Sequence, residues 1–380
     1  MLSDILIQLI VFLLPTQLGL HFWPSFARVQ GVKVDYLSPT IYAIDLVILS
    51  LIILNIVPIL RYLKNNLLTV IVFISFVIIN IIFSLSPLNS LSWWIHSILY
   101  LLFFITLRIK KINWKQVRKP LLISIMVVVA IEIIQLCLQS SLGGIMYYLG
   151  ERAFSASTSG LGRLNLLGLE VIRPMSIFSH PNSLAGYLLT VFYLFHKKDS
   201  KSWYQLIPFL GILLTFSKSA TICLALLVFN IRPDILIYLS LLLTFVQPLI
   251  PNLATSWQPV SDRLLYFSYL KKIVAENYLT GTGLGNFIPS LGNFLPGSYL
   301  TPSILQPIHN LLYLAMTEIG ILGTILVTIS LFKKNVRKII FNPQIIGLIG
   351  ILLFTGAFDH YSWTLPQNKL IFFFALAIMI

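Results

Sequence analysis

The side chains that could do chemistry in this chain are few, and most of them stand at the ends of long apolar runs. One segment, RPMSIFSHPNSLAGYLL at 173–189, contains Arg173, His180 and Asn182. Proline near the first turn is typical of a helix start, so Pro181 predicts a helix that begins there. Two interpretations stay open: an arginine at a membrane rim beside an ordinary helix cap, or an arginine that binds an anion.

Two further cations lie at the borders of apolar segments. Lys218, within FSKSA at 216–220, separates two short apolar runs. Its ammonium group could extend to water, or it could face a cavity and hold an anion. Arg263 follows Asp262 at the start of a segment that mixes apolar and charged residues. Because a helix dipole favours an acid but not a base at the helix start, an anion partner is the better interpretation for Arg263.

A fourth segment, PIHNLLYLAMTEIGILG at 307–323, opens a predicted helix with His309 and Asn310. Glu318 lies within this helix, where a buried carboxylate costs about 2–4 kcal/mol and must face protein, water or a partner. The spacing puts Glu318 on nearly the opposite helix face from His309 and on the same side as Asn310. A structural polar contact is therefore the favoured interpretation for Glu318.

The closing segment GAFDHYSWTLPQN at 356–368 adds Asp359 and His360, and Asp45 and Glu132 are acids within predicted spans. Motifs for other chemistries are absent from the sequence. It contains no Asp-x-Asp pair, no metal-ligand spacing of His, Cys or Asp, and no glycine loop of a nucleotide site. The sequence therefore predicts chemistry without a metal ion, a nucleotide or another cofactor.

The elements that must position these side chains are membrane helices. Of the 380 residues, 57% are apolar and only 10% are charged, whereas a soluble domain has about 25% charged residues. The apolar runs predict an all-α, polytopic membrane helix bundle of about 10–12 transmembrane helices, forming a single domain, 1–380. The first run lacks the basic residues of a secretory signal, so we expect an uncleaved helix. The predicted spans lie near 4–20, 38–60, 67–85, 91–107, 120–139, 181–196, 203–217, 219–231, 235–251, 308–331, 344–358 and 369–380.

The net charge of +14 is mainly a topology signal. With the N-terminus in the cytoplasm, the short inside loops have a higher density of Lys and Arg than the longer outside segments, as the positive-inside rule requires. This distribution excludes nucleic-acid binding as the reason for the charge. Two outside segments are long, about 140–180 and 252–307, and function tends to lie in such loops. The second predicts an amphipathic helix at the outer interface, followed by an irregular, Gly- and Pro-rich loop.

Taken in order, these segments resemble the bacterial O-antigen ligase and O-antigen polymerase family of membrane glycan transferases. The matching pieces are Arg173 with FSHPNSLAGYL, the stretch Ser217-Lys218-Ser219-Ala220, Arg263 with the helix after it, GTGLGNF, and HNLLYLAMTEIGILG. They cover roughly residues 170–330. Lys218 departs from the family pattern, in which Arg is usual. Lysine keeps the charge but loses the bidentate fork.

The resemblance implies a fold of the lipid-phosphate-sugar glycosyltransferase (GT-C-like) type in the bacterial cytoplasmic membrane, with its active face outside. It implies a donor glycan on undecaprenyl pyrophosphate, a glycan, lipid or protein acceptor, and inverting transfer without a metal. Ligation of a finished chain and polymerisation of repeat units both stay open. Cations aimed at the pyrophosphate would assist its departure, a role for Arg173, Lys218 and Arg263. A neutral histidine can accept the acceptor's proton near pH 7, a role for His309, with Asn310 orienting it or a sugar.

Four polar side chains are expected to support this site: His180, Asn182, Glu318 and Asp359. Two other classes of function stay open. A transporter or flippase of a lipid-linked or anionic solute would use buried acids to couple an ion, although the sequence shows none of the internal repeats common in transporters. A structural membrane scaffold would explain the helices, but not the clustering of Arg and His at their outer ends.

Overall fold

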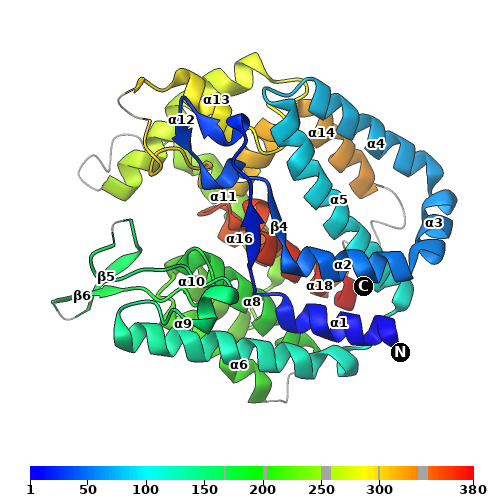
Figure 1. Cartoon of the computed structure of the whole chain (residues 1–380), viewed down its shortest axis with the longest axis vertical. Helices are drawn as coiled ribbons and strands as arrows, with labels where there is room; N and C mark the ends of the chain where they lie inside the picture. The colour runs from blue at the N-terminus through cyan, green and yellow to red at the C-terminus, as the bar shows by residue number, and fades with distance from the viewer. Residues whose placement is uncertain (159, 167, 200–202, 250–257, 298–299, 333–340) are drawn as a thin grey trace.

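Helices account for most of the fold, as the apolar segments predict (Figure 1). The computed structural model describes residues 1–380 except 159, 167, 200–202, 250–257, 298–299 and 333–340. For residues 249, 258–265, 331 and 332 it describes the backbone alone.

The long apolar helices agree with a membrane protein. Among the described residues, three helices are long and apolar enough to cross a bilayer: α5 (Pro87–Lys110), α6 (Trp114–Leu138) and α14 (Leu311–Phe332). The number rises to four if α2 (Ala43–Leu54) and α3 (Ile56–Asn65), which meet at a 74° bend, form one broken span. The total of ten to twelve spans stays a prediction.

The other apolar helices are shorter than these spans. In the part of the chain that the structure describes, they are 10–17 residues long, whereas a full span needs about 20 residues. They can cross a bilayer only together with the segments that flank them. They are α1 (Leu2–Leu13), α4 (Leu67–Ile82), η3 with α9 (Trp203–Gln205 and Leu206–Leu214), α10 (Lys218–Val228), α11 (Pro233–Val246), α16 (Pro343–Gly356) and α18 (Pro366–Met379).

The central helix is α8 (Pro181–Lys198), which begins where the sequence predicts. Pro181 occupies its first turn, and its last turn carries His196, Lys197 and Lys198, a charge order that the helix dipole favours. Its side chains are buried on nearly every face from the start to Phe195, because α9, α10, α16 and α18 pack around it. A helix that is apolar all round belongs in a core, so α8 is a rigid base for the residues at its N-terminus.

Three short antiparallel strand pairs depart from the all-α prediction. In the described residues β1 (Gly19–His21) pairs with β4 (Thr40–Tyr42), β2 (Arg28–Val29) with β3 (Val32–Lys33), and β5 (Arg163–Leu166) with β6 (Leu169–Ile172). The β2–β3 and β5–β6 hairpins lie in segments predicted as external loops, whereas β1 begins within the predicted span 4–20 and β4 lies within the predicted span 38–60. Outside a helix, the backbone N–H and C=O groups need other hydrogen-bond partners, and the paired strand provides them. Figure 1 shows β1 and β4 running between the α1–α2 region and the α12–α13 region.

Two predicted segments need correction. The span predicted at 38–60 is not one helix, since it begins as β4 and bends between α2 and α3 at Asn55. The buried Asn55 amide donates to the Leu51 carbonyl at 2.8 Å, which ends α2 there. In the segment 252–307 the predicted helix is confirmed as α12 (Gln258–Glu276). The loop predicted after it contains a further helix, α13 (Phe287–Phe294), whose apolar residues are buried.

The two largest hydrophobic clusters of the described residues contain most of their buried apolar side chains. The larger one joins α1, α2, α5, α6, α8, α16 and α18. The second joins β2, the short helix η2 (Asp35–Leu37), α12, α13 and the start of α14. The loop between α16 and the short helix α17 (Tyr361–Thr364) contacts both clusters. Its Asp359 accepts a hydrogen bond from Asn182 of α8, and its His360 ring packs against Tyr36 of η2. The polar residues of this loop therefore lie where the two clusters meet.

Candidate active site

Asn182 joins two other predicted site residues, Arg173 and Asp359, in one hydrogen-bonded chain. Arg173 donates from Nη2 to the Asn182 Oδ1 at 2.8 Å, and Asn182 donates from Nδ2 to the Asp359 Oδ2 at 3.1 Å. Arg173 also donates from Nε to the Thr215 carbonyl at 2.9 Å. These bonds use two of the five N–H donors of a guanidinium. Arg173 is half-buried, so it is a fixed cation at the junction of α8 and the α9–α10 turn.

Asp359 and two histidines form the centre of the site. The rings of His309 and His360 make an edge-to-face contact, with centroids 5.2 Å apart. His360 Nε2 lies 3.9 Å from Asp359 Oδ1, and His360 Nδ1 lies 2.9 Å from Thr364 Oγ1. Asp359 and His360 are 8% and 4% exposed, whereas His309 is only half-buried. Part of the His309 side chain is therefore open to solvent, whereas protein covers Asp359 and His360.

The surroundings of Asp359 favour its ionised form. Burial alone would raise the pKa of Asp359. Three imidazoles and one amide outweigh burial and hold the pKa of this carboxyl well below its ordinary value. These groups belong to His360, His309, His180 and Asn182. The site thus contains a carboxylate that can stabilise a protonated imidazole beside it.

Comparison with known proteins adds no relative. The chain matches no known protein family and no curated protein. The resemblance to O-antigen ligases and polymerases therefore depends on the order of the motifs in the sequence.

His180 is the N-cap of α8. Its Nδ1 accepts a hydrogen bond from the backbone N–H of Asn182 at 3.1 Å. The capping role that the sequence left open is therefore present. The same ring also lies close enough to Asp359 to lower its pKa, so His180 both starts the helix and adds to the polar site.

Aromatic side chains that the sequence analysis did not single out flank the histidines. Tyr36 meets the His360 ring edge-on at 5.5 Å, and Tyr266 lies 6.2 Å from the His309 ring. Burial, with the charge of Asp359 close by, raises the pKa of Tyr36. Tyr266 could have been found, because it lies three residues after Arg263 on one helix face. Nothing in the sequence around Tyr36 gives such a signal.

Asn310 holds the start of α14. Its Oδ1 accepts from the backbone N–H groups of Leu312 and Tyr313 at 3.1 and 3.2 Å. Its Nδ2 donates to the Gln247 Oε1 at 3.0 Å, and the side chain is fully buried. These bonds fix the backbone directly after His309, so the structure gives Asn310 a part in positioning that histidine.

Glu318 takes part in the packing of the glycine loop GTGLGNF. Its Oε2 accepts from Trp363 Nε1 at 2.8 Å, and its Oε1 accepts from the Phe287 N–H at 3.4 Å. Its carbonyl accepts from the N–H of Gly283, a residue with φ of 89°, beside the break of α14 at Gly320. The described hydrogen bonds of Glu318 therefore serve this packing and do not reach the histidines.

The two other predicted cations, Lys218 and Arg263, lie on helices α10 and α12. Lys218 is exposed at the start of α10, three residues after Thr215, whose carbonyl binds Arg173. Arg263 is part of α12, but its side chain lies outside the described residues. Its position, one helix turn before Tyr266, puts its backbone next to the residue that contacts His309.

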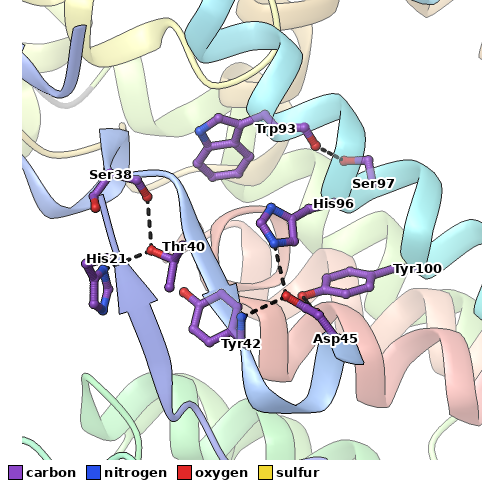
Figure 2. Close-up of polar contacts among 9 residues, drawn as sticks. All are labelled: His21, Ser38, Thr40, Tyr42, Asp45, Trp93, His96, Ser97 and Tyr100. Carbon is purple, nitrogen blue, oxygen red and sulfur yellow. Dashed lines mark hydrogen bonds and ion pairs between the residues drawn. The ribbon is translucent and has the colours of Figure 1, made fainter. Parts of the chain in front are cut away.

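Asp45 and Glu132, two acids within predicted spans, have different surroundings. Figure 2 shows Asp45 accepting from the Tyr42 N–H at 3.0 Å and from the Tyr100 hydroxyl at 3.1 Å, with His96 Nε2 also at 3.1 Å. Asp45 thus caps α2 and joins it to α5. Glu132 is fully buried in α6, and neither of its carboxyl oxygens has a hydrogen-bond partner among the described residues.

Proposed function

We propose that the chain transfers a glycan from undecaprenyl pyrophosphate to a hydroxyl of a glycan, lipid or protein acceptor at the outer face of the bacterial cytoplasmic membrane. The observation that carries this proposal is the chain from Arg173 through Asn182 to Asp359 and the paired histidines. It places a fixed cation, an anion and a half-buried imidazole together. The order of the family motifs in the sequence supports the same reaction.

The cation acts on the leaving group. When the acceptor oxygen attacks the anomeric carbon, the bond from that carbon to the phosphate oxygen breaks, and the pyrophosphate keeps the electron pair. Arginine binds phosphate oxygens through several N–H groups, and a preorganised donor stabilises charge that develops in the transition state. Arg173 is held in advance by Asn182 and Thr215. Lys218 and Arg263 would neutralise the remaining phosphate charge.

The imidazole acts on the acceptor. His309 takes the proton of the attacking hydroxyl, which makes the oxygen a better nucleophile. The product is an imidazolium next to the Asp359 carboxylate and the His360 ring. An anion at this place stabilises the positive ring, as the acid of a catalytic triad does. Attack opposite the departing phosphate inverts the anomeric carbon.

Tyr36 and Tyr266 provide contact surface for a sugar. Aromatic rings present a large apolar face with a polar tip. Tyr266 lies beside His309, the proposed base, and Tyr36 lies beside His360. The Tyr266 hydroxyl is held by the Ile304 carbonyl at 2.9 Å. The proposal therefore places the reacting sugar between α12, η2 and the α16–α17 loop.

The arrangement of the helices agrees with an external site. The β5–β6 hairpin, predicted outside, lies at the left edge of Figure 1, and the N-terminus and α3, predicted at the cytoplasmic side, lie toward the right. The α6 helix runs between these two sides. This arrangement supports the proposal that the site loops lie on the side that the positive-inside rule places outside the cell.

Cysteine labelling tests this orientation. In a Cys137→Ser background, Leu169→Cys in the exposed hairpin should react with an impermeant maleimide on intact cells. Lys111→Cys, exposed in the turn between α5 and α6, should react only after permeabilisation. Labelling of Lys111→Cys alone on intact cells would reverse the topology and place the site inside.

Chelation and nucleotide addition test the chemistry. The sequence contains neither an Asp-x-Asp pair nor a phosphate-binding glycine loop. Transfer by the purified protein should therefore survive EDTA and should need neither a sugar nucleotide nor ATP. Complete inhibition by EDTA that is reversed by Mg²⁺ or Mn²⁺ would contradict this mechanism.

A transporter or flippase is the second candidate, because Glu132 is a buried carboxyl of the kind that couples ions in membranes. A strain that lacks the chain separates the alternatives. Loss of long surface glycans is the expected result for a polymerase, and accumulation of long lipid-linked chains is expected for a ligase. Short repeat units trapped on the cytoplasmic side would instead favour the flippase.

A further inference from the structure

We propose that His309, Asp359 and His360 bind one divalent transition-metal ion of the Zn²⁺ class and that this ion blocks transfer. Each residue offers one ligand atom, and all three atoms lie within 4.8 Å of one another. Imidazole nitrogens and carboxylate oxygens are ordinary zinc ligands. The metal site is inferred from this geometry alone. Only the inhibition of transfer by the bound ion rests on the proposed function.

The distance between Asp359 and His360 fits a bridging ion. Asp359 Oδ1 and His360 Nε2 are 3.9 Å apart, too far for a hydrogen bond. Ligand atoms bound about 2.1 Å from a tetrahedral zinc ion are about 3.4 Å apart. The two side chains therefore need to approach by only a fraction of an ångström to share an ion, and His309 faces the same space.

The ligands are oriented by atoms that would not touch the metal. His360 Nδ1 contacts Thr364 Oγ1 at 2.9 Å, which leaves Nε2 turned toward Asp359. The other carboxylate oxygen of Asp359 accepts from Asn182 at 3.1 Å. Such contacts fix ring orientation and are typical of metal-binding histidines and carboxylates. Burial of Asp359 and His360 further limits their movement.

The consequence for the reaction follows from the lone pair of His309. An imidazole nitrogen that coordinates zinc cannot accept the proton of the acceptor hydroxyl. A bound ion would therefore remove the base and stop transfer. Two imidazoles favour Zn²⁺ or Co²⁺ over Mg²⁺ and Ca²⁺, which prefer oxygen ligands, so the blocking should be selective.

The test uses the full chain in lipid nanodiscs after removal of any histidine tag. Calorimetric titration with Zn²⁺ should give one site per chain, and Mg²⁺ should give none. Asp359→Asn and His360→Ala should each weaken binding of Zn²⁺ at least 10-fold, whereas the matched control His21→Ala, in strand β1, should leave it unchanged. Thr364→Val, which loses only the orienting hydroxyl, should weaken binding several-fold in a chain that keeps all three ligands.

Zinc binding that is absent, or that is the same in wild type and His360→Ala, would overturn the metal site. Zn²⁺ should also inhibit transfer, and EDTA should restore it. A single bound Zn²⁺ that leaves the transfer rate unchanged would overturn the blocking effect. Specific zinc binding by a metal-free protein that transfers no glycan would leave the site standing and contradict the proposed function instead.

Discussion

Replacing His309 with alanine should lower the transfer rate by about 10²–10⁴, the usual effect of losing a general acid–base group. His309 is the half-buried member of the histidine pair, and the buried Asp359 carboxylate lies close enough to stabilise its protonated ring. Binding of the lipid-linked donor should be largely kept, because the cations hold the pyrophosphate. A rate assay and a donor-binding assay on the same purified variant separate these two effects.

The other two histidines of the site serve as controls. His180→Ala removes the cap of α8 and should cost about 1 kcal/mol of stability, with a smaller loss of rate than His309→Ala. If His309→Ala transfers normally and His180→Ala is inactive, the base has been misassigned. If the alanine variants of His180, His309 and His360 are all active, no histidine of the site is the base, and a carboxylate or water must accept the proton instead.

Replacing Arg173 with alanine should lower the transfer rate by about 10²–10³, as removal of one preorganised donor does in other acyl- and group-transfer sites. Its guanidinium is held by the Asn182 Oδ1 and the Thr215 carbonyl. Arg173→Lys should recover only part of the rate, since a lysine keeps the charge but cannot make both bonds at once. The rate should be measured with protein whose expression and thermal unfolding match wild type.

Arg163 offers a matched control for Arg173. It lies in the same segment, the predicted external loop at 140–180, but its guanidinium pairs with Glu170 at 3.0 Å at the surface of the β5–β6 hairpin. Arg163→Ala should therefore transfer at nearly the wild-type rate, because exposed ion pairs contribute little. Wild-type transfer by a stable Arg173→Ala protein would show that the pyrophosphate role of Arg173 is wrong.

The sequence predicted best what is decided locally. Pro181 after His180 marks a helix start by its own conformational preference, and the structure places the start of α8 there. The membrane helices follow in the same way from apolar composition. Arg173 and Asp359 were predicted as site residues from their positions at the ends of apolar runs.

Contacts between side chains that lie far apart in the sequence could not be predicted. Nothing in the residues around Tyr36 or His360 indicates that their rings meet, because this contact depends on how two hydrophobic clusters pack. The three residues proposed to bind a metal ion were not grouped by the sequence for the same reason. His309 and the Asp359-His360 pair lie far apart in sequence, whereas a spacing search finds ligands within one motif.

Backbone breaks were also hidden in the sequence. The bend at Asn55 depends on a buried amide that bonds its own helix, and the break of α14 at Gly320 depends on the glycine loop packed against it. In each case the apolar run continues through the break, so composition predicts one straight span. In the structure, a hydrogen bond or a packed loop breaks each of these helices instead.

The most direct test of the central claim is turnover by the purified chain in nanodiscs. The assay would supply an undecaprenyl-pyrophosphate glycan and a glycan acceptor, without nucleotide or added metal, and would measure the elongated product and the released undecaprenyl pyrophosphate. The account predicts that both appear in equal amounts with wild type and that His309→Ala binds the donor without forming either. A folded wild-type protein that binds the donor but forms no new glycosidic bond with any glycan, lipid or protein acceptor would contradict it.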